Sequence, residues 1–301
     1  MRSAKGLRCD DKGLRFAKGH GTGNDFVIVP DVDGVLDLSA QDAARLCDRR
    51  FGIGGDGVLR VVRVDGEWFM DYRNADGSLA ETCGNGIRVY ARYLVEAGLA
   101  EPGRIPLRTR GGAVVAVVGA DEVSVDMGLP RLYGDSTATV SGTRLRGSAV
   151  DCGNPHLVCP VPAPALSGLD LSTPPSVDPG LFPAGVNVEL VTPAAQLSGV
   201  DLQQPPGADL HVRARVHERG SGETLSCGSG AVAVAAVALR DAGRQAGVVA
   251  VDLPGGRLTV TFDGTTAWLA GPAVVVAWGE TALLGPDRVS GARSGPSRVG
   301  R

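Results

Sequence analysis

Lysine is almost missing from this 301-residue chain, in which Lys5, Lys12 and Lys18 are the only three and arginine supplies the remaining positive charge. Two of these lysines lie in residues 1–13, a polar stretch that we expect to be disordered. Enzymes that use pyridoxal phosphate need a lysine to form a Schiff base with the cofactor. The shortage of lysine therefore favours chemistry that needs no such cofactor.

Long apolar runs and a basic net charge are missing as well. No run approaches the roughly 20 apolar residues of a membrane span, and residues 1–13 lack the apolar segment of a secretory signal. The formal net charge of −3 gives no support to a nucleic-acid or anionic-membrane partner. We therefore expect a cytoplasmic protein without a nucleic-acid or membrane partner. A homodimer is compatible with the sequence.

The six cysteines include no pair with CxxC spacing. Cys152 and Cys159 are seven positions apart, and His156 is the only further ligand type between them, so a zinc site is not predicted. A chain of this size without a secretory signal is expected to keep its thiols reduced.

Two of these thiols occupy repeated positions. Cys83 opens the turn CGNG at residues 83–86, and Cys227 opens the turn CGSG at residues 227–230; an apolar run with helical spacing follows each turn. Asn74 lies nine positions before Cys83, and Glu218 lies nine positions before Cys227. This pattern indicates a degenerate internal repeat with one reactive cysteine in each half.

The position of each cysteine predicts its chemistry. At a helix N-terminus the dipole and the unpaired N–H groups should lower the pKa of the thiol from about 8.5 toward neutrality. The glycines let backbone amides approach a carboxylate closely. If the two halves face one cleft, one thiolate can remove an α-proton while the opposite thiol delivers a proton to the other face. The paired turns thus predict inversion at the α-carbon of an amino acid, with the helix ends stabilising enediolate-like charge.

The spacing of the elements predicts an α+β fold, because hairpins surround one apolar helix in each half and the βαβ rhythm of a parallel sheet is missing. We expect helices from Ser39 to about Arg50, from Cys83 to Gly98, and over the apolar run 231–239. Residues 19–26 are expected to form a glycine-rich loop, and the prolines of residues 160–183 indicate a surface connection rather than core. Residues 52–57 spell GxGxxG, but a helix precedes them and a strand follows, so we reject a dinucleotide site.

Seven stretches together resemble the diaminopimelate epimerase family, whose members need no cofactor. They follow the family's order over about residues 16 to 280 and are residues 18–26 (KGHGTGNDF), 72–78 (YRNADGS), 83–86 (CGNG), 153–156 (GNPH), 187–189 (NVE), 218–224 (ERGSGET) and 227–230 (CGSG). The resemblance implies an isomerase that interconverts LL- and meso-2,6-diaminopimelate in lysine and peptidoglycan precursor biosynthesis.

The resemblance also implies the domain organisation. Two pseudo-symmetric domains are expected, each a mostly antiparallel β-barrel-like layer around a central helix, with the active site in the cleft between them. The N-terminal domain would comprise residues 14–128 plus 273–285, because the last strand returns to it, and the C-terminal domain would comprise residues 129–272. Residues 1–13 and 286–301 would be disordered tails.

Residue roles follow from the same resemblance. Cys83 and Cys227 would be the acid–base pair, with pKa values tuned by His156 and Glu218. The remaining substrate-binding residues fall into three groups: Asn74 and Glu218 at the reacting amino group, the backbone amides of Gly84, Asn85, Gly228 and Ser229 at the adjacent carboxylate, and Asn24, Asn154, Asn187 and Arg219 at the distal amino-acid end. Gly57 departs from the family, which often has glutamine there, and the proline-rich stretch after Pro160 matches no motif.

Other functions compete with this interpretation. Proline and hydroxyproline racemases carry histidine after the first Cys-Gly, where this chain has Asn85, and phenazine-type isomerases lack the cysteine pair. A non-catalytic amino-acid-binding protein would bind without turnover. In a thiol-switch protein, Cys83 and Cys227 would instead form a disulfide.

Overall fold

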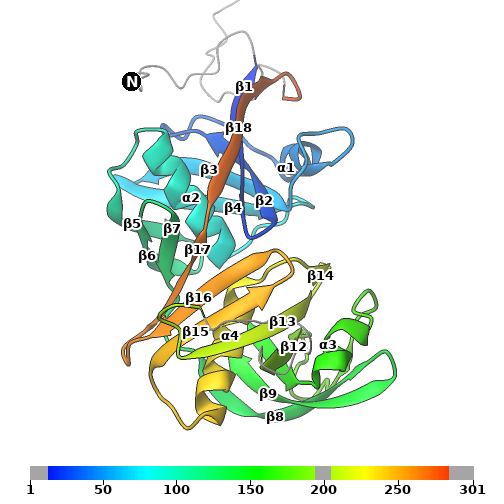
Figure 1. The fold of residues 1–301 in the computed structure, drawn as a ribbon. Helices are drawn as coiled ribbons and strands as arrows, with labels where there is room; N and C mark the ends of the chain where they lie inside the picture. Colours follow the sequence, from blue (N-terminus) through cyan, green and yellow to red (C-terminus); the bar gives the residue numbers. More distant parts are fainter. Residues whose placement is uncertain (1–12, 194–204, 285–301) are drawn as a thin grey trace, which may run out of the picture.

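The computed structural model describes residues 13–193 and 205–284. Two lobes lie one above the other in Figure 1, and each wraps β-strands around one central helix. This arrangement confirms the predicted α+β fold. The two expected tails lie almost wholly outside the described residues.

The first lobe contains most of the chain before residue 127 and the last strand. Its strands are β1 (Leu14–Gly21), β2 (Asn24–Pro30), β3 (Gly57–Val64), β4 (Glu67–Asn74), β5 (Gly103–Thr109), β6 (Gly112–Val118), β7 (Glu122–Asp126) and β18 (Val274–Thr281), and its helices are α1 (Ala40–Cys47) and α2 (Gly84–Glu96).

The second lobe contains the elements from residue 131 to residue 272. Its strands are β8 (Arg131–Val140), β9 (Thr143–Asp151), β10 (Pro155–Pro160), β11 (Ser176–Val177), β12 (Asn187–Pro193), β13 (Leu210–Glu218), β14 (Gly222–Thr224), β15 (Gly247–Leu253), β16 (Gly256–Phe262) and β17 (Ala267–Pro272), and its helices are α3 (Ala163–Gly168) and α4 (Gly228–Asp241).

Most strand pairings are antiparallel, as predicted, but each lobe also has parallel pairs at corresponding places. In the first lobe β4 and β5 are parallel with α2 between them in sequence, and in the second lobe β13 and β15 are parallel with α4 between them. The pairs β2–β3 and β10–β12 are parallel as well. Each lobe therefore contains a crossover through its central helix, which places the start of that helix at the carboxyl end of a strand.

The two central helices differ in how they bury their surface. Helix α4 is apolar on nearly every face, and all of residues 230–237 are buried, as the apolar run predicts. Helix α2 is buried over residues 84–94 although it carries Arg88 and Arg92. More of α2 is therefore buried than the apolar run after Cys83 indicates.

Strand pairing also joins the two lobes. Strand β17 pairs with β16 of the second lobe and with β7 of the first lobe, from Trp268–Asp126 to Pro272–Glu122. Strand β18 then pairs with β1 along its length. The continuous pairing crosses the expected domain boundaries, and those boundaries stay a prediction.

Three local expectations need correction. Residues 19–26 form a β-hairpin rather than a loop, because Gly21 pairs with Asn24 around a two-residue turn in which Thr22 and Gly23 have φ values of 51° and 84°. The helix after Ser39 has the predicted cap but ends at Cys47, three residues before Arg50. The proline-rich stretch is not merely a surface connection.

That stretch contributes to a separate apolar cluster of the second lobe. Leu166, Leu171 and Phe182 are buried and pack with residues of β8, β10 and β12. Because these three residues are spaced irregularly around the short elements α3 and β11, their burial could not be predicted from the sequence.

Candidate active site

The N-termini of the two central helices abut. Cys83 is the N-cap of α2 and Cys227 is the N-cap of α4, so both thiols lie where the sequence predicts them. A methyl group at Gly228 would lie 2.9 Å from a methyl carbon of Leu269 and 3.3 Å from the Cα of Gly84. Only glycine at the first turn lets the two helix ends approach so closely.

The Cys83 thiol lies among polar groups of the first lobe. Its sulfur accepts a hydrogen bond from the Gly86 N–H at 3.3 Å and lies 3.6 Å from Asn24 Oδ1. Burial raises the pKa of Cys83 to about 11, although the Gly86 N–H and the nearby Arg88 act to lower it.

The Cys227 thiol lies among acidic groups of the second lobe. Its sulfur is 3.6 Å from Ser229 Oγ. Burial, followed by the carboxylates of Glu218 and Glu189, raises the pKa of Cys227 well above its usual value. The two thiols therefore have unlike electrostatic surroundings.

These shifts overturn the expected pKa values. The helix N-termini were expected to lower both thiol pKa values toward neutrality, but burial of the thiols is the larger influence on each. Both cysteines consequently favour the thiol form at pH 7.

A buried polar network lies behind the helix ends and was missed by the sequence analysis. The Asn85 side-chain N–H₂ lies 3.3 Å from Asn24 Oδ1 and 3.1 Å from the Ser226 carbonyl oxygen, so it links the two lobes. Arg88 donates to Asn85 Oδ1 at 2.9 Å and is completely buried. The signal that could have identified this network is Arg88 itself, a charged residue in the apolar run that follows Cys83.

Glu189 belongs to the quoted stretch 187–189, but the sequence did not indicate a role for it. His156 Nδ1 lies 2.6 Å from Glu189 Oε1, His156 Nε2 lies 3.0 Å from Asn154 Oδ1, and the imidazole is completely buried. The same Glu189 oxygen would be 2.8 Å from a methyl group at Gly230, in the first turn of α4. A buried carboxylate thus connects His156 with the start of the helix that Cys227 caps.

Four other expected residues make local contacts. Asn187 Oδ1 accepts a hydrogen bond from the Arg219 N–H at 2.9 Å, and Arg219 Nη1 donates to the Ala184 carbonyl at 2.9 Å. Glu218 ends β13 and accepts a hydrogen bond from the Thr224 hydroxyl; burial raises its pKa. Asn74 ends β4 and donates to Ser78 Oγ at 3.0 Å.

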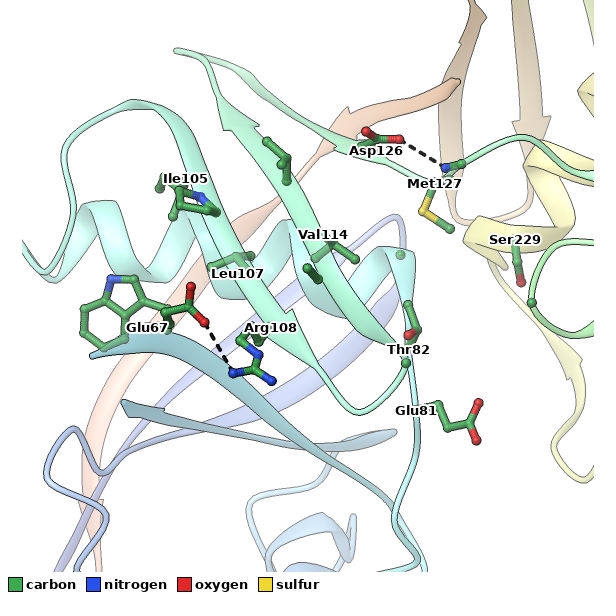
Figure 2. Close-up of a pocket in the computed structure, with 18 of the residues that line it drawn as sticks. Glu67, Glu81, Thr82, Ile105, Leu107, Arg108, Val114, Asp126, Met127 and Ser229 are labelled. Carbon is green, nitrogen blue, oxygen red and sulfur yellow. Dashed lines mark hydrogen bonds and ion pairs between the residues drawn. The ribbon is translucent and has the colours of Figure 1, made fainter. Parts of the chain in front are cut away.

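A cavity of about 1410 Å³ opens between the lobes and reaches four expected residues, Gly84, Asn154, Arg219 and Ser229. Figure 2 shows Ser229 facing this space across from Thr82 and Glu81. The cavity extends over β5 and β6, past the Glu67–Arg108 ion pair of 3.4 Å. Cys83 and Cys227 are not among its lining residues; Cys83 is partly exposed and Cys227 is buried.

Gly57 has no room for a side chain in this structure. A methyl group there would lie 2.6 Å from Cε2 of Tyr72 and 2.5 Å from the Arg73 carbonyl oxygen. The Tyr72 ring, which packs edge-on against Phe26, therefore occupies the space that a longer residue at position 57 would need.

Neither a metal centre nor a membrane-spanning helix is found in residues 13–193 and 205–284. No three His, Cys, Asp or Glu side chains gather there in a way that could hold a metal ion. No helix of these residues is both long enough and apolar enough to cross a membrane.

Comparison of the sequence with known families gives one match that covers most of the chain. The model of the family described as diaminopimelate epimerase matches residues 16–133 and 148–282. A protein of that description from Rhodococcus jostii is 49% identical over 291 residues, covering 88% of this chain and 96% of the relative. Its counterpart from Corynebacterium glutamicum is 47% identical over 289 residues, covering 90% and 99%.

Two solved structures with similar folds have much lower sequence identity to this chain. A phenazine biosynthesis protein of the PhzF family from Bacillus anthracis superposes with a TM-score of 0.64 at 16% identity, covering 90% of this chain and 99% of that chain. A hydroxyproline epimerase from Agrobacterium vitis, with bound trans-4-hydroxy-L-proline, gives 0.60 at 15% identity, covering 90% and 91%. At these identities the likeness concerns the fold alone.

Proposed function

The chain belongs to the diaminopimelate epimerase family, and from this membership we infer that it interconverts LL- and meso-2,6-diaminopimelate in lysine biosynthesis. The family match covers both cysteine turns, and its close relatives are aligned over nearly their whole length.

The mechanism that we propose uses Cys83 and Cys227 as the two proton-transfer groups. The thiolate of one cysteine takes the α-proton, and the electron pair of the C–H bond moves into the adjacent carboxylate as an enediolate. The thiol of the other cysteine then protonates the opposite face, which leaves the second sulfur as the thiolate. The observation that carries this proposal is that two cysteines cap two helices whose N-termini abut.

The helix ends supply the electrostatic stabilisation. Backbone N–H groups of Gly84, Asn85, Gly228 and Ser229 lie in the first turns of α2 and α4, where intrahelical acceptors are lacking. We assign them to the reacting carboxylate, whose negative charge grows as the α-proton leaves. No cofactor is then required to delocalise that charge.

The remaining polar groups would orient the substrate. We assign Asn74 and Glu218 to the reacting ammonium group and Asn24, Asn154, Asn187 and Arg219 to the distal amino-acid end. Arg219 and Asn154 line the cavity, which supports this placement, whereas Asn24 lies beside Cys83. His156 and Glu218 would tune the thiols, and Glu189 joins them through its contact with His156. We place this enzyme in the cytoplasm, acting on a small molecule without a nucleic-acid or membrane partner.

The substrate is tested by comparing amino acids under one set of conditions. Purified protein is incubated with LL-diaminopimelate, L-proline or trans-4-hydroxy-L-proline, and the stereoisomers are separated by chiral chromatography. We expect meso-diaminopimelate to accumulate to an equilibrium mixture, without added pyridoxal phosphate, and both proline substrates to remain unchanged. Turnover of a proline substrate with unchanged diaminopimelate would contradict the assignment.

A further inference from the structure

Arg88 is a completely buried cation that lacks an acidic partner. Its guanidinium donates to Asn85 Oδ1 at 2.9 Å and to Thr22 Oγ1 at 3.3 Å, and both acceptors are neutral. Its Nε has no hydrogen-bond partner, and no ion pair found among residues 13–193 and 205–284 includes Arg88. Burial lowers the pKa of Arg88 to about 10, so this group remains a cation at neutral pH. A buried charge without a counter-charge is costly to a fold.

The surrounding backbone is shaped to admit this guanidinium. A methyl group at Gly21 of β1 would lie 3.0 Å from Arg88 Nη2, and one at Gly271 of β17 would lie 3.6 Å from Nε. Glycine at position 21 therefore leaves room for the planar group, and Gly271 lies in ordinary van der Waals contact with it. The fold therefore holds this charge in one place, whereas the charge of a flexible surface side chain would move.

Hydrogen bonds connect Arg88 with residues beside both helix ends. Arg88 fixes the oxygen of Asn85, so the amide N–H₂ of Asn85 points to Asn24 and to the Ser226 carbonyl. Thr22, the other acceptor, lies 2.6 Å from Ser226 Oγ. Ser226 immediately precedes Cys227, and Asn24 lies beside Cys83. Arg88 thus stands behind the point where the two halves of the site meet.

We propose that Arg88 is a positioning residue of this site, whose uncompensated positive charge orients the Asn85 amide and favours negative charge on the Cys83 side of the cleft. Arg88 does not touch the substrate. Its missing partner is the negative charge that the substrate carboxylate brings into the site and the further charge that develops on the thiolate and the enediolate during turnover. This inference rests on the proposed function, because an anion must enter the site.

Other charged groups also act on these residues. Glu218 of β13 raises the pKa of Cys83 and opposes Arg88, and the Tyr72 hydroxyl of β4 lies close enough to sense the Cys83 charge. Glu122 of β7 influences Arg88 from farther away. Near Cys227 the charges are the carboxylates of Glu218 and Glu189. The effect of removing Arg88 should therefore fall mainly on Cys83.

The test compares Arg88→Gln, which removes the charge but keeps a donor, with Arg88→Lys, which keeps the charge but loses the planar fork. Arg92→Gln is the matched control, since Arg92 is also buried on α2 and lies one turn farther from Cys83. Ligand-free proteins are treated with iodoacetamide at pH 8, and alkylation rates are measured separately for the Cys83 and Cys227 peptides by mass spectrometry. Melting temperatures and epimerisation rates are measured on the same samples.

In Arg88→Gln we expect the Cys83 alkylation rate to fall about tenfold, because one unit of pKa changes the thiolate fraction tenfold. The Cys227 rate should change little, the melting temperature should not fall, and kcat/KM for LL-diaminopimelate should drop about 100-fold. Arg88→Lys should keep the Cys83 rate within about threefold of the native rate, and Arg92→Gln should leave both cysteine rates and turnover near native values.

An unchanged Cys83 rate in a folded Arg88→Gln protein would overturn the proposal, as would a lower melting temperature with faster alkylation of both cysteines. If Arg88→Gln does not fold, Arg88→Lys decides the matter. A tenfold loss of Cys83 reactivity despite the retained charge would then overturn it. Alkylation requires no substrate, so failure of this proposal is distinguishable from failure of the native protein to turn over diaminopimelate.

Discussion

Alanine at Cys83 or at Cys227 should lower kcat for epimerisation by about 1000-fold or more, because each substitution removes one of the two groups that transfer the proton. The loss should appear in both reaction directions, since each thiol serves as base in one direction and as acid in the other. Initial rates from LL- and from meso-diaminopimelate would be measured by chiral chromatography.

The matched control is Cys47→Ala. Cys47 is a free cysteine that is buried like Cys227, but it lies at the end of α1 in an apolar cluster with Leu46 and Val58. This variant should keep nearly full turnover, even if the lost packing lowers its melting temperature. Near-native turnover by folded Cys83→Ala or Cys227→Ala would contradict the assignment of that thiol.

Glu218→Gln should lower kcat/KM by about 100-fold or more, because truncating one side of a buried charge pair costs about 2–5 kcal/mol. In the proposed complex this carboxylate faces the substrate ammonium, and the amide of glutamine cannot supply the charge. Steady-state kinetics with LL-diaminopimelate would measure the effect. The matched control is Glu223→Gln, since Glu223 lies five positions later and forms an exposed ion pair with Arg215 of 2.7 Å.

The stability of Glu218→Gln should change in the opposite direction from its activity. Burial raises the pKa of Glu218 above its unfolded value, so the folded protein holds this proton more tightly than the unfolded chain does. Stability from this group is thus present below the unfolded pKa and lost as pH rises. At pH 8 glutamine removes the cost of the buried carboxylate, and the melting temperature should equal or exceed that of the native protein. A large drop in melting temperature, or a similar loss of activity in Glu223→Gln, would contradict this account.

The local elements that position the thiols could be predicted from the sequence. A cysteine before a glycine turn and an apolar helical run predicts the N-caps of α2 and α4, and both are found. The hairpin at Asp65 and Gly66 follows from turn chemistry, and both residues have positive φ. These features depend on residues that are neighbours in the chain.

The missed features depend on tertiary packing. Arg88 looks like a solvent-facing helix residue until β1 and β17 enclose it, and Glu189 looks like one residue of a strand until His156 of the neighbouring strand approaches it. The direction of the thiol pKa shifts fails for the same reason, because desolvation is set by the packing of the whole site. Strands β8 and β9 are hard to predict from the sequence, because much of their surface is exposed and their residues do not alternate clearly.

The central claim, proton exchange by two opposed thiols, is tested most directly by isotope incorporation at early reaction times. LL-diaminopimelate is incubated with the native protein in heavy water, and the residual substrate and the meso product are analysed separately by mass spectrometry. With two bases, the product should carry one deuterium at the inverted α-carbon while the residual substrate still carries protium. A product that retains its original proton would show that one base returns the same proton to the other face. Equal labelling of substrate and product from the start would show that one base exchanges the proton with solvent. Either result would contradict the account.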